Sequence, residues 1–342
     1  MAHRSIDIKG RALSIHKAVT APGFGEKTIL VTDTWDYITL WLKRNHHAEA
    51  RFYWDQARSF YSATVSLPKE SSPLTAYYCM LNAVKALLLV KKIKFADKHG
   101  VSGKTVGVRT SLSNEIVEFK AGGILAELCR HLGETANNQT YSLQHLLYNL
   151  PYVHRAFDLS LESAPELFIP IRKPCVVRSG KTNEAWFCAE LDGRYANKAT
   201  LKRLPAHYEQ DITFIDRFVI RSKRRFNWVP SDKPGSLQRY AKYHAQIRRD
   251  VHYIHSAQKL WYLKRNDTVD GHIARSTITL AFGAMHKLSE LARYSPQSLA
   301  RHFEGRYNWL LSEFIAIAPL QFLDEISCEM TGHEFMPPGR VS

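Results

Sequence analysis

The chain has 342 residues, of which 45% are hydrophobic and 11% aromatic, so its composition excludes a disordered polymer and predicts a well-buried core in one or two domains. Its 47 lysines and arginines outnumber 32 acids, and the formal charge of +15 favours acidic partners. No run of about eighteen apolar residues occurs, and the first residues hold no apolar core. We therefore expect a cytoplasmic protein with neither a signal peptide nor a membrane partner.

Metal and cofactor sites are not expected either. The cysteines are scattered without a C-x-x-C pair, which argues against a zinc ribbon or a disulfide framework. His252 and His255 could share a metal at helical spacing, but Arg248 and Arg249 beside them would repel a cation. The G-K-T ending at Gly103 has Lys98 where a phosphate loop needs its first glycine, so a surface turn is the better interpretation.

The first elements in chain order are two long helices. Apolar residues at helical spacing predict a helix over residues 34–64, bent or broken near residues 45–47. Pro73 is a typical first-turn proline and opens a second helix with a broad apolar stripe. Residues 98–123 then favour a loop and a strand. Two short helices are expected around residues 124–132 and 142–150.

The middle of the chain has a β pattern, and the end is helical. Short apolar runs separated by Gly, Pro, Asn and Asp predict a β-rich insertion between about residues 165 and 229. After a break, Ser236 caps a long helical pattern that continues to Trp261. Two further helices complete the chain, the last one bent at Pro319. The predicted parts are a helical amino-terminal part (1–160), the β-rich insertion (161–232) and carboxy-terminal helices that complete the bundle (233–342).

The most basic stretch runs from Arg217 to Arg265, where thirteen lysines and arginines face two acids. Aromatic residues are interleaved with these cations. Phosphate contacts need the cations, and base stacking needs the aromatic rings. This pattern predicts a nucleic-acid partner, RNA more than DNA, and leaves an acidic protein partner open. The candidate nucleic-acid-binding residues are Arg221, Lys223, Arg224, Arg225, Trp228, Arg248 and Lys259.

The spacing R-x(4–6)-H bears on catalysis, because it supports metal-independent RNA cleavage in one large helical superfamily. Arginine would hold the scissile phosphate and histidine would move the proton. The pairs that fit are Arg11/His16, Arg239/His244, Arg248/His255, Arg249/His255 and Arg265/His272. With 25 arginines and 16 histidines, about 3.5 pairs arise by chance, so the number of pairs carries no information. By position on the predicted helix, Arg249 and His255 are the first catalytic candidates, and Arg239 and His244 are the alternative.

Several segments resemble a known family. Residues 50–61, 72–89 and 98–100, together with 291–296 and 309–314, are similar to the YaaC-like family of bacterial proteins. That family has no established activity to carry over. More distantly, the tyrosines of segment 76–88 and the following His99 resemble HEPN domains, helical bundles common in toxins and antiviral systems, some of them ribonucleases.

These resemblances imply a mainly α fold, α+β in class, in which a HEPN-like helical bundle is interrupted by the β-rich insertion. The expected function is that of a nucleic-acid-engaging bacterial protein in phage defence or a toxin system, with metal-independent ribonuclease activity as its enzymatic form. The alternative is a non-catalytic subunit that binds nucleic acid or a protein partner within a larger complex.

Overall fold

The structure is a computed structural model that describes residues 3–161, 165–266 and 268–338. The chain forms two compact units. We call Met1–Leu30, Leu167–His272 and Gly332–Ser342 the sheet unit, and Val31–Glu166 and Ile273–Thr331 the helical unit. Each unit therefore draws on segments that are far apart in the sequence.

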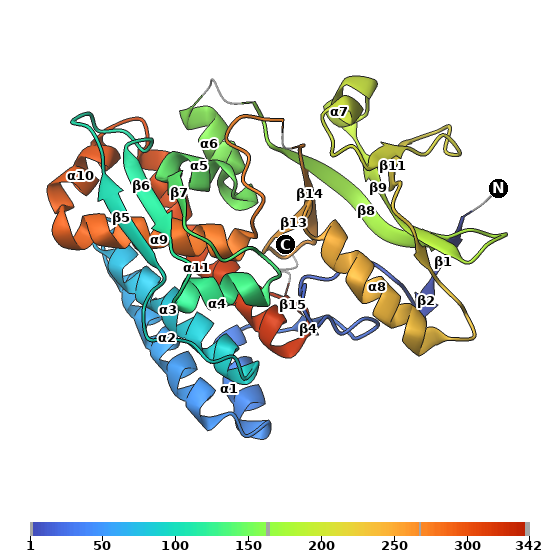
Figure 1. Ribbon diagram of the computed structural model, residues 1–342, viewed down its shortest axis with the longest axis horizontal. Coiled ribbons are helices and arrows are strands. Elements are labelled where there is room, and N and C mark those ends of the chain that lie inside the picture. Colours follow the sequence, from blue (N-terminus) through green and yellow to red (C-terminus); the bar gives the residue numbers. More distant parts are fainter. Residues whose placement is uncertain (1–2, 162–164, 267, 339–342) are drawn as a thin grey trace. The chain divides into compact units, whose positions relative to one another are not determined.

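The helical unit contains most of the helices and one small sheet (Figure 1). Its elements are α1 (Thr34–Arg44), α2 (Ala48–Ser66), α3 (Ser72–Val90), β5 (Val101–Thr105), β6 (Glu115–Phe119), α4 (Ile124–His131), β7 (Gln139–Ser142), α5 (Leu143–Tyr148), η1 (Pro151–Val153), α6 (His154–Ser160), α9 (Thr277–Tyr294), α10 (Pro296–Glu304) and α11 (Asn308–Thr331). Strands β5, β6 and β7 pair antiparallel in that order.

Helix α3 lies at the centre of the helical unit, where it packs against α2, α9 and α11. Pro73 lies in its first turn, and the helix is buried on most sides because it has no polar face. The helix predicted to start at Pro73 is confirmed, as is the break near residues 45–47, where His46 has a φ of +58° between α1 and α2. Helix α3 is also long and apolar enough to cross a membrane, but most of it is buried inside the protein, as in a core helix.

The sheet unit is built around an eight-stranded antiparallel sheet. Its elements are β1 (Arg4–Ser5), β2 (Asp7–Ile8), β3 (Arg11–Ala12), β4 (Ile29–Leu30), β8 (Phe168–Arg178), β9 (Glu184–Leu191), η2 (Gly193–Tyr195), α7 (Lys198–Lys202), β10 (Tyr208–Gln210), β11 (Phe218–Ser222), β12 (Phe226–Asn227), α8 (Lys233–Ile247), β13 (Val251–Ile254), β14 (Leu260–Lys264) and β15 (Phe335–Met336). The strand order is β10-β11-β9-β8-β14-β13, with β1 paired to β8 and β12 paired to β9.

The two faces of this sheet have different environments because side chains alternate along each strand. On β9, Ala185, Phe187 and Ala189 join the main core of the unit, which also contains the apolar face of α8. The residues between them, Trp186 and Cys188, belong to a smaller cluster on the opposite face. The main core therefore lies between the sheet and α8.

The fold-class prediction is wrong. Helices hold 44% of the residues, but strands hold 19%, and the eight-stranded sheet makes this a mixed α+β fold with no HEPN helical bundle shown. The segment interpreted as an insertion contributes the central strands β8 and β9. Strand β8 pairs with β1 from the start of the chain and with β14 from beyond residue 232. The β-like segment is therefore the framework of its own unit.

The continuous helix predicted from Ser236 to Trp261 is also wrong. It ends at Ile247, and the chain continues into the hairpin of β13 and β14. Ile247, Val251 and Ile254 are spaced four and three residues apart, which fits a helix, but the β-branched and aromatic residues after Asp250 fit a strand equally well. Pairing of β14 with β8 decides between the two patterns.

The G-K-T segment forms strand β5 and is neither a turn nor a phosphate loop. The backbone N–H of Gly103 donates a hydrogen bond of 3.1 Å to Oε1 of Glu290 on α9. A Cβ atom at this position would lie 2.0 Å from the other carboxylate oxygen of Glu290 and 2.8 Å from a side-chain carbon of Lys287. A side chain at this position would therefore displace the Glu290 carboxylate and the end of Lys287.

Replacing Gly103 with alanine should lower the free energy of unfolding by about 1 kcal/mol, because the added methyl group displaces the Glu290 carboxylate from its hydrogen bond with the backbone N–H of residue 103. Urea denaturation monitored by circular dichroism measures the change. Gly122→Ala is the matched control, since no atom lies within 4 Å of a Cβ there. Equal stability of the two variants would contradict the close approach of Gly103 to Glu290.

Candidate nucleic-acid interface

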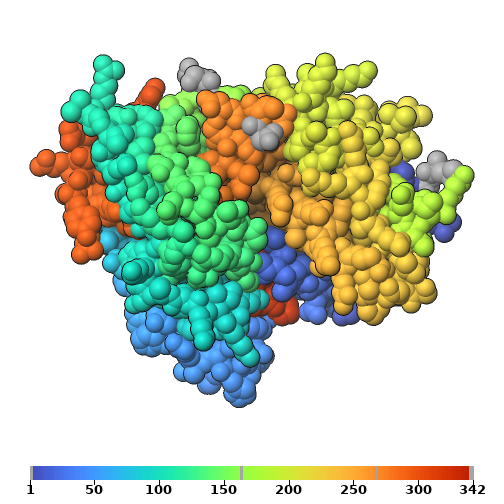
Figure 2. Space-filling model, in the orientation of Figure 1, coloured from blue at the N-terminus to red at the C-terminus, as the bar shows by residue number. Residues whose placement is uncertain are grey.

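The positive charge of the protein is concentrated in one unit. The sheet unit has 27 lysines and arginines against 13 aspartates and glutamates, a net charge of +14. The helical unit has 20 against 19, a net charge of +1. The space-filling view shows that the yellow and light orange segment, which carries most of the basic stretch, is widely exposed (Figure 2). A polyanion would therefore be attracted to the sheet unit.

The aromatic residues of the basic stretch lie mainly in the core. Trp228 is 4% exposed, and its ring meets Phe226 edge to face. Tyr240 and Tyr243 are buried between α8 and the sheet, and the Tyr240 hydroxyl donates to the carbonyl of Ser14 at 2.9 Å. These rings hold α8 on the sheet, so Trp228 is not available as a platform for base stacking.

Several predicted phosphate-binding side chains are paired within the sheet unit. Nε of Arg221 donates to Glu209 at 2.8 Å, and Arg225 lies over the ring of Trp186, 4.5 Å from its centroid. Lys223 donates to the carbonyl of Ala206 at 2.8 Å. Arg224 differs, since its guanidinium is exposed and forms no hydrogen bond or ion pair with any residue that the structure describes.

Arg248 has a structural role. Its guanidinium donates to the carbonyl oxygens of Val251 and, at 3.2 Å, Lys17. It also lies over two aromatic rings, 5.5 Å from the centroid of Tyr253 and 5.2 Å from that of Trp261. Arg248 therefore joins the end of α8 to the hairpin and to the amino-terminal segment.

Arg239 and His244, the alternative catalytic pair, form hydrogen bonds with different parts of the sheet unit. Arg239 donates to the carbonyl of Asn227 at 2.8 Å and to Asp232 at 3.2 Å. His244 is completely buried, and its Nε2 accepts the backbone N–H of His16 at 3.0 Å. One side chain thus fixes the start of α8, and the other anchors the amino-terminal segment in the core.

The environment of His244 holds the imidazole neutral. Burial lowers its pKa well below the ordinary value, and the positive charge of Arg248 adds to this effect. An imidazole that accepts a buried backbone N–H and resists protonation suits a structural role better than proton transfer to a substrate.

The first catalytic pair, Arg249 and His255, flanks strand β13. Arg249 lies in the turn before Val251 and is exposed, whereas His255 follows Ile254 and is half-buried. Four extended residues span about 13 Å, so the two side chains begin at opposite ends of the strand. The sequence predicted that this pair lies on one face of a helix. The structure instead separates Arg249 from His255 by a strand.

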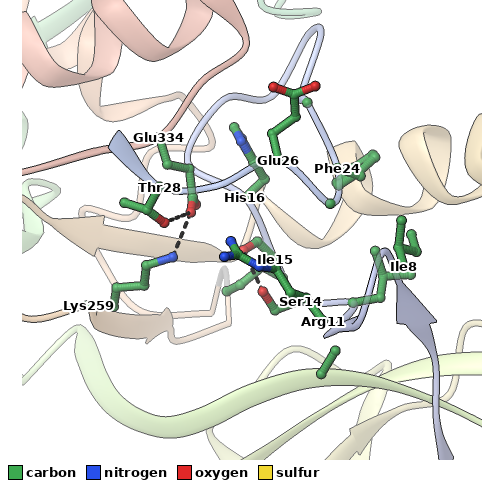
Figure 3. A pocket seen from close by; sticks show the side chains of 14 residues that line it. Ile8, Arg11, Ser14, Ile15, His16, Phe24, Glu26, Thr28, Lys259 and Glu334 are labelled. Atoms are coloured by element: carbon green, nitrogen blue, oxygen red, sulfur yellow. Dashed lines mark hydrogen bonds and ion pairs between the residues drawn. The ribbon is translucent and has the colours of Figure 1, made fainter. Parts of the chain in front are cut away.

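A pocket of about 120 Å³ opens within the sheet unit and brings together residues from three segments (Figure 3). Arg11 and His16 come from the amino-terminal segment, Lys259 precedes β14, and Glu334 precedes β15. Glu334 accepts hydrogen bonds from Lys259 at 2.6 Å and from the backbone of Lys17 at 3.0 Å. The exposed guanidinium of Arg11 has no hydrogen-bond or ionic partner among the described residues.

Glu334 is an anion at neutral pH in this pocket. Burial alone would raise its pKa, but His16, Lys259 and the backbone of Lys17 together hold it below the ordinary value. The carboxylate therefore orders Lys259 while Arg11 keeps all its donors for a ligand. An anionic group with several acceptor oxygens, such as a phosphate, matches these donors.

Sequence reasoning counted Arg11 and His16 as a spaced pair but did not single them out, and it missed Glu334. The signal for Arg11 and His16 was their R-x(4–6)-H spacing, but chance produces nearly as many pairs with this spacing as the sequence contains. Nothing in the sequence indicates that Glu334 joins them, since this residue lies 317 positions after Lys17.

A comparison with models of protein families shows to which family the chain belongs. Residues 25–330 match the model of the YaaC-like protein family. The chain belongs to the YaaC-like family. No curated protein and no solved structure gave a significant match to this YaaC-like chain. The family match covers the basic stretch and Lys259 but ends before Glu334 and begins after Arg11 and His16.

The sheet unit of this YaaC-like protein offers cations to a ligand. Within residues 3–161, 165–266 and 268–338, no group of three or more His, Cys, Asp or Glu side chains is arranged to hold a metal ion. The unpaired cations on the sheet unit and the pocket beside Arg11 offer guanidinium and ammonium donors. These groups can contact phosphates without any bond being broken.

Proposed function

We propose that this YaaC-like protein binds nucleic acid, with RNA as the preferred ligand, through the sheet unit and without cleaving it at the predicted Arg/His pairs. The observation that carries the proposal is the partition of charge, +14 on the sheet unit and +1 on the helical unit. Phosphate contacts depend on such charge and supply most of the affinity of sequence-independent binding.

The contacts are assigned to cations that the fold leaves unpaired. Exposed lysines and arginines of the sheet unit without a hydrogen-bond or ionic partner among its described residues are Arg4, Lys9, Arg11, Lys27, Lys181, Lys198, Lys202, Arg203, Arg224, Lys233, Lys242 and Arg249. Of the residues predicted from sequence, Arg224 and Arg249 belong to this set. Arg249 is thus proposed as a phosphate contact in place of a catalytic clamp.

Binding is preferred over cleavage because His244 and His255, the two histidines predicted to be catalytic, are poorly placed for proton transfer. His244 is buried and bonded to the backbone, and His255 is separated from Arg249 by strand β13. With no HEPN bundle in the fold, the likeness that motivated a defence or toxin role gives no further support. We therefore propose a non-catalytic nucleic-acid-binding protein.

Fluorescence anisotropy with a single-stranded RNA of about 20 nucleotides tests the proposal. A variant with Arg11, Lys242, Arg224 and Arg249 all changed to glutamine should bind at least tenfold more weakly at 100 mM salt. Each lost phosphate contact should reduce the slope of log K against log salt by about 0.7, so four contacts reduce it by up to about 3.

The matched control changes four exposed, unpaired cations of the helical unit, Arg44, Lys92, Lys94 and Lys98, to glutamine. It removes the same charge and should keep most of the affinity. Equal losses in both variants would reject the sheet unit as the interface. No binding by the wild type at about 50 mM salt would reject the nucleic-acid partner and favour an acidic protein.

The ribonuclease alternative needs its own experiment. Labelled RNA incubated with wild type in EDTA should remain intact, and Arg249→Ala and His255→Ala should behave in the same way. Cleavage by the wild type that is lost in either variant would replace the binding proposal with a catalytic one. His244→Ala is less informative, because it removes a buried anchor of the amino-terminal segment.

A further inference from the structure

Two cysteines face each other across the centre of the sheet. Cys175 on β8 and Cys188 on β9 are register partners in an antiparallel pair. Partners in antiparallel strands have Cα atoms about 4.5–5.5 Å apart, within the range of about 4.4–6.8 Å that disulfides occupy. Register partners also project from the same face, so both thiols lie on one side of the sheet.

The surroundings distinguish these two thiols from the others. Cys188 is buried with Trp186 and Val219 in the small cluster on the sheet face opposite α8, and Cys175 packs against that cluster while remaining half-exposed. The remaining cysteines are buried in the helical unit. Cys175 is thus the more accessible of the two thiols.

We propose that Cys175 and Cys188 form a reversible cross-strand disulfide by exchange with an oxidised low-molecular-weight thiol such as oxidised glutathione. The Cys175 thiolate attacks one sulfur of that disulfide, giving a mixed disulfide and releasing one thiolate. The Cys188 thiolate then attacks the Cys175 sulfur and releases the second. Two protein thiols are oxidised by two electrons, and one small disulfide is reduced to two thiols.

The pKa values of the two thiols determine the rate of this exchange. Burial raises the pKa of both thiols, more strongly for Cys188, and Glu190 adds to the effect at Cys175, while Arg217 opposes it. Because the thiolate is the reacting form, the rate should rise about tenfold for each unit of pH in the neutral range. Exchange is therefore slower at neutral pH than in mildly alkaline solution.

The disulfide would act on the part of the sheet that is least regular. The pairing of β8 with β9 shifts register between Arg172 and Cys175, and Lys173 has a φ of +47° there. Cys188 is also the register partner of Arg221 on β11. A covalent link closes the short loop from residue 175 to residue 188 and fixes β8 to β9 beside the proposed interface.

The test uses the full-length protein, reduced, desalted and incubated with oxidised glutathione at pH 8.5. Free thiols are then alkylated in denaturant, and the digest is analysed by mass spectrometry. We expect a cross-linked peptide pair containing Cys175 and Cys188, alkylated Cys79, Cys129 and Cys328, and a melting temperature raised by about 5 °C or more. Dithiothreitol should reverse all of these changes.

Two variants separate the steps. Cys188→Ser should trap glutathione on Cys175 as a stable mixed disulfide, because the second attack is lost. Cys175→Ser should leave Cys188 alkylated and free of glutathione, because its thiol is shielded. Matching circular dichroism spectra would show that both variants fold.

The opposite results overturn the proposal. These are a wild type in which Cys175 stays free or remains joined to glutathione, or glutathione on Cys188 in the Cys175→Ser variant. Oxidation of Cys79, Cys129 or Cys328 at the same rate would show reaction through unfolding and would overturn it equally. None of these outcomes depends on nucleic-acid binding.

Discussion

Replacing Glu115 with glutamine should destabilise the helical unit by about 1.5–3 kcal/mol, because the buried Lys287 ammonium loses the nearer of its two carboxylate partners and keeps only Glu290, at 4.0 Å. Glu115 is 2% exposed and Lys287 is 3% exposed, with 3.2 Å between Oε2 and Nζ. The other carboxylate oxygen lies 3.1 Å from Nε2 of His302, and Thr105 donates to Oε2 at 2.6 Å. One substitution therefore disturbs three polar partners, of which Lys287 and His302 are buried.

Urea denaturation of the purified variant measures this effect. Glu118→Gln is the matched control, since Glu118 lies three residues along the same strand and pairs with two exposed lysines, Lys104 and Lys120, near the solvent. Its loss should leave the unfolding midpoint nearly unchanged. Glu115→Gln combined with Lys287→Met should recover part of the stability. A single variant as stable as wild type would show that Glu115 and Lys287 do not form a buried pair.

Acid should destabilise the protein between pH 6.5 and 5, before most carboxylates titrate. Burial lowers the pKa of His286 to about 3, and it lowers those of His244 and His252 well below their ordinary value. The unfolded chain binds a proton at each of these sites below about pH 6.5, but the folded protein does not, so stability falls as pH falls. Each histidine should cost about 2 kcal/mol between pH 7.5 and pH 5.

Urea midpoints recorded from pH 7.5 to pH 4.5 test this dependence. His286→Leu should reduce the pH slope for the helical unit by about one proton, and His252→Leu should do the same for the sheet unit. The depressed pKa of Glu115 adds its own loss only below about pH 4.5, where the unfolded carboxylate becomes protonated. A flat profile from pH 7.5 to 5 would show that these imidazoles are protonated in the folded protein.

Local structure could be predicted well wherever one pattern dominated. Pro73 and its apolar stripe marked α3, and the short apolar runs at residues 175–177 and 186–188 marked β8 and β9. The prediction for the hairpin after Ile247 was wrong because the spacing of its apolar residues fits both a helix and a strand. Only the pairing of β14 with β8 selects the strand. Strands as short as Arg4–Ser5 and Asp7–Ile8 carry no periodic signal at all.

The candidate interface was predictable as a total charge but not as a set of contacts. Sequence located the basic stretch, but Arg221 finds Glu209 only because β10 pairs with β11. From its position next to cations, Trp228 was predicted to stack on bases, but it is buried in the core between the sheet and α8. Residues from distant segments decide which cations remain free, and no local pattern records those partners.

The assembly of the sheet unit from both ends of the chain has a consequence for synthesis. Strand β15 pairs with β4, and Glu334 accepts the backbone N–H of Lys17 across 317 positions. Closing so long a separation is slow, and it cannot begin until Glu334 has been translated. A nascent chain released earlier would keep the exposed cations of the sheet unit but lack the carboxylate that orders Lys259. Such a truncated product would carry the charge of the native surface without its geometry.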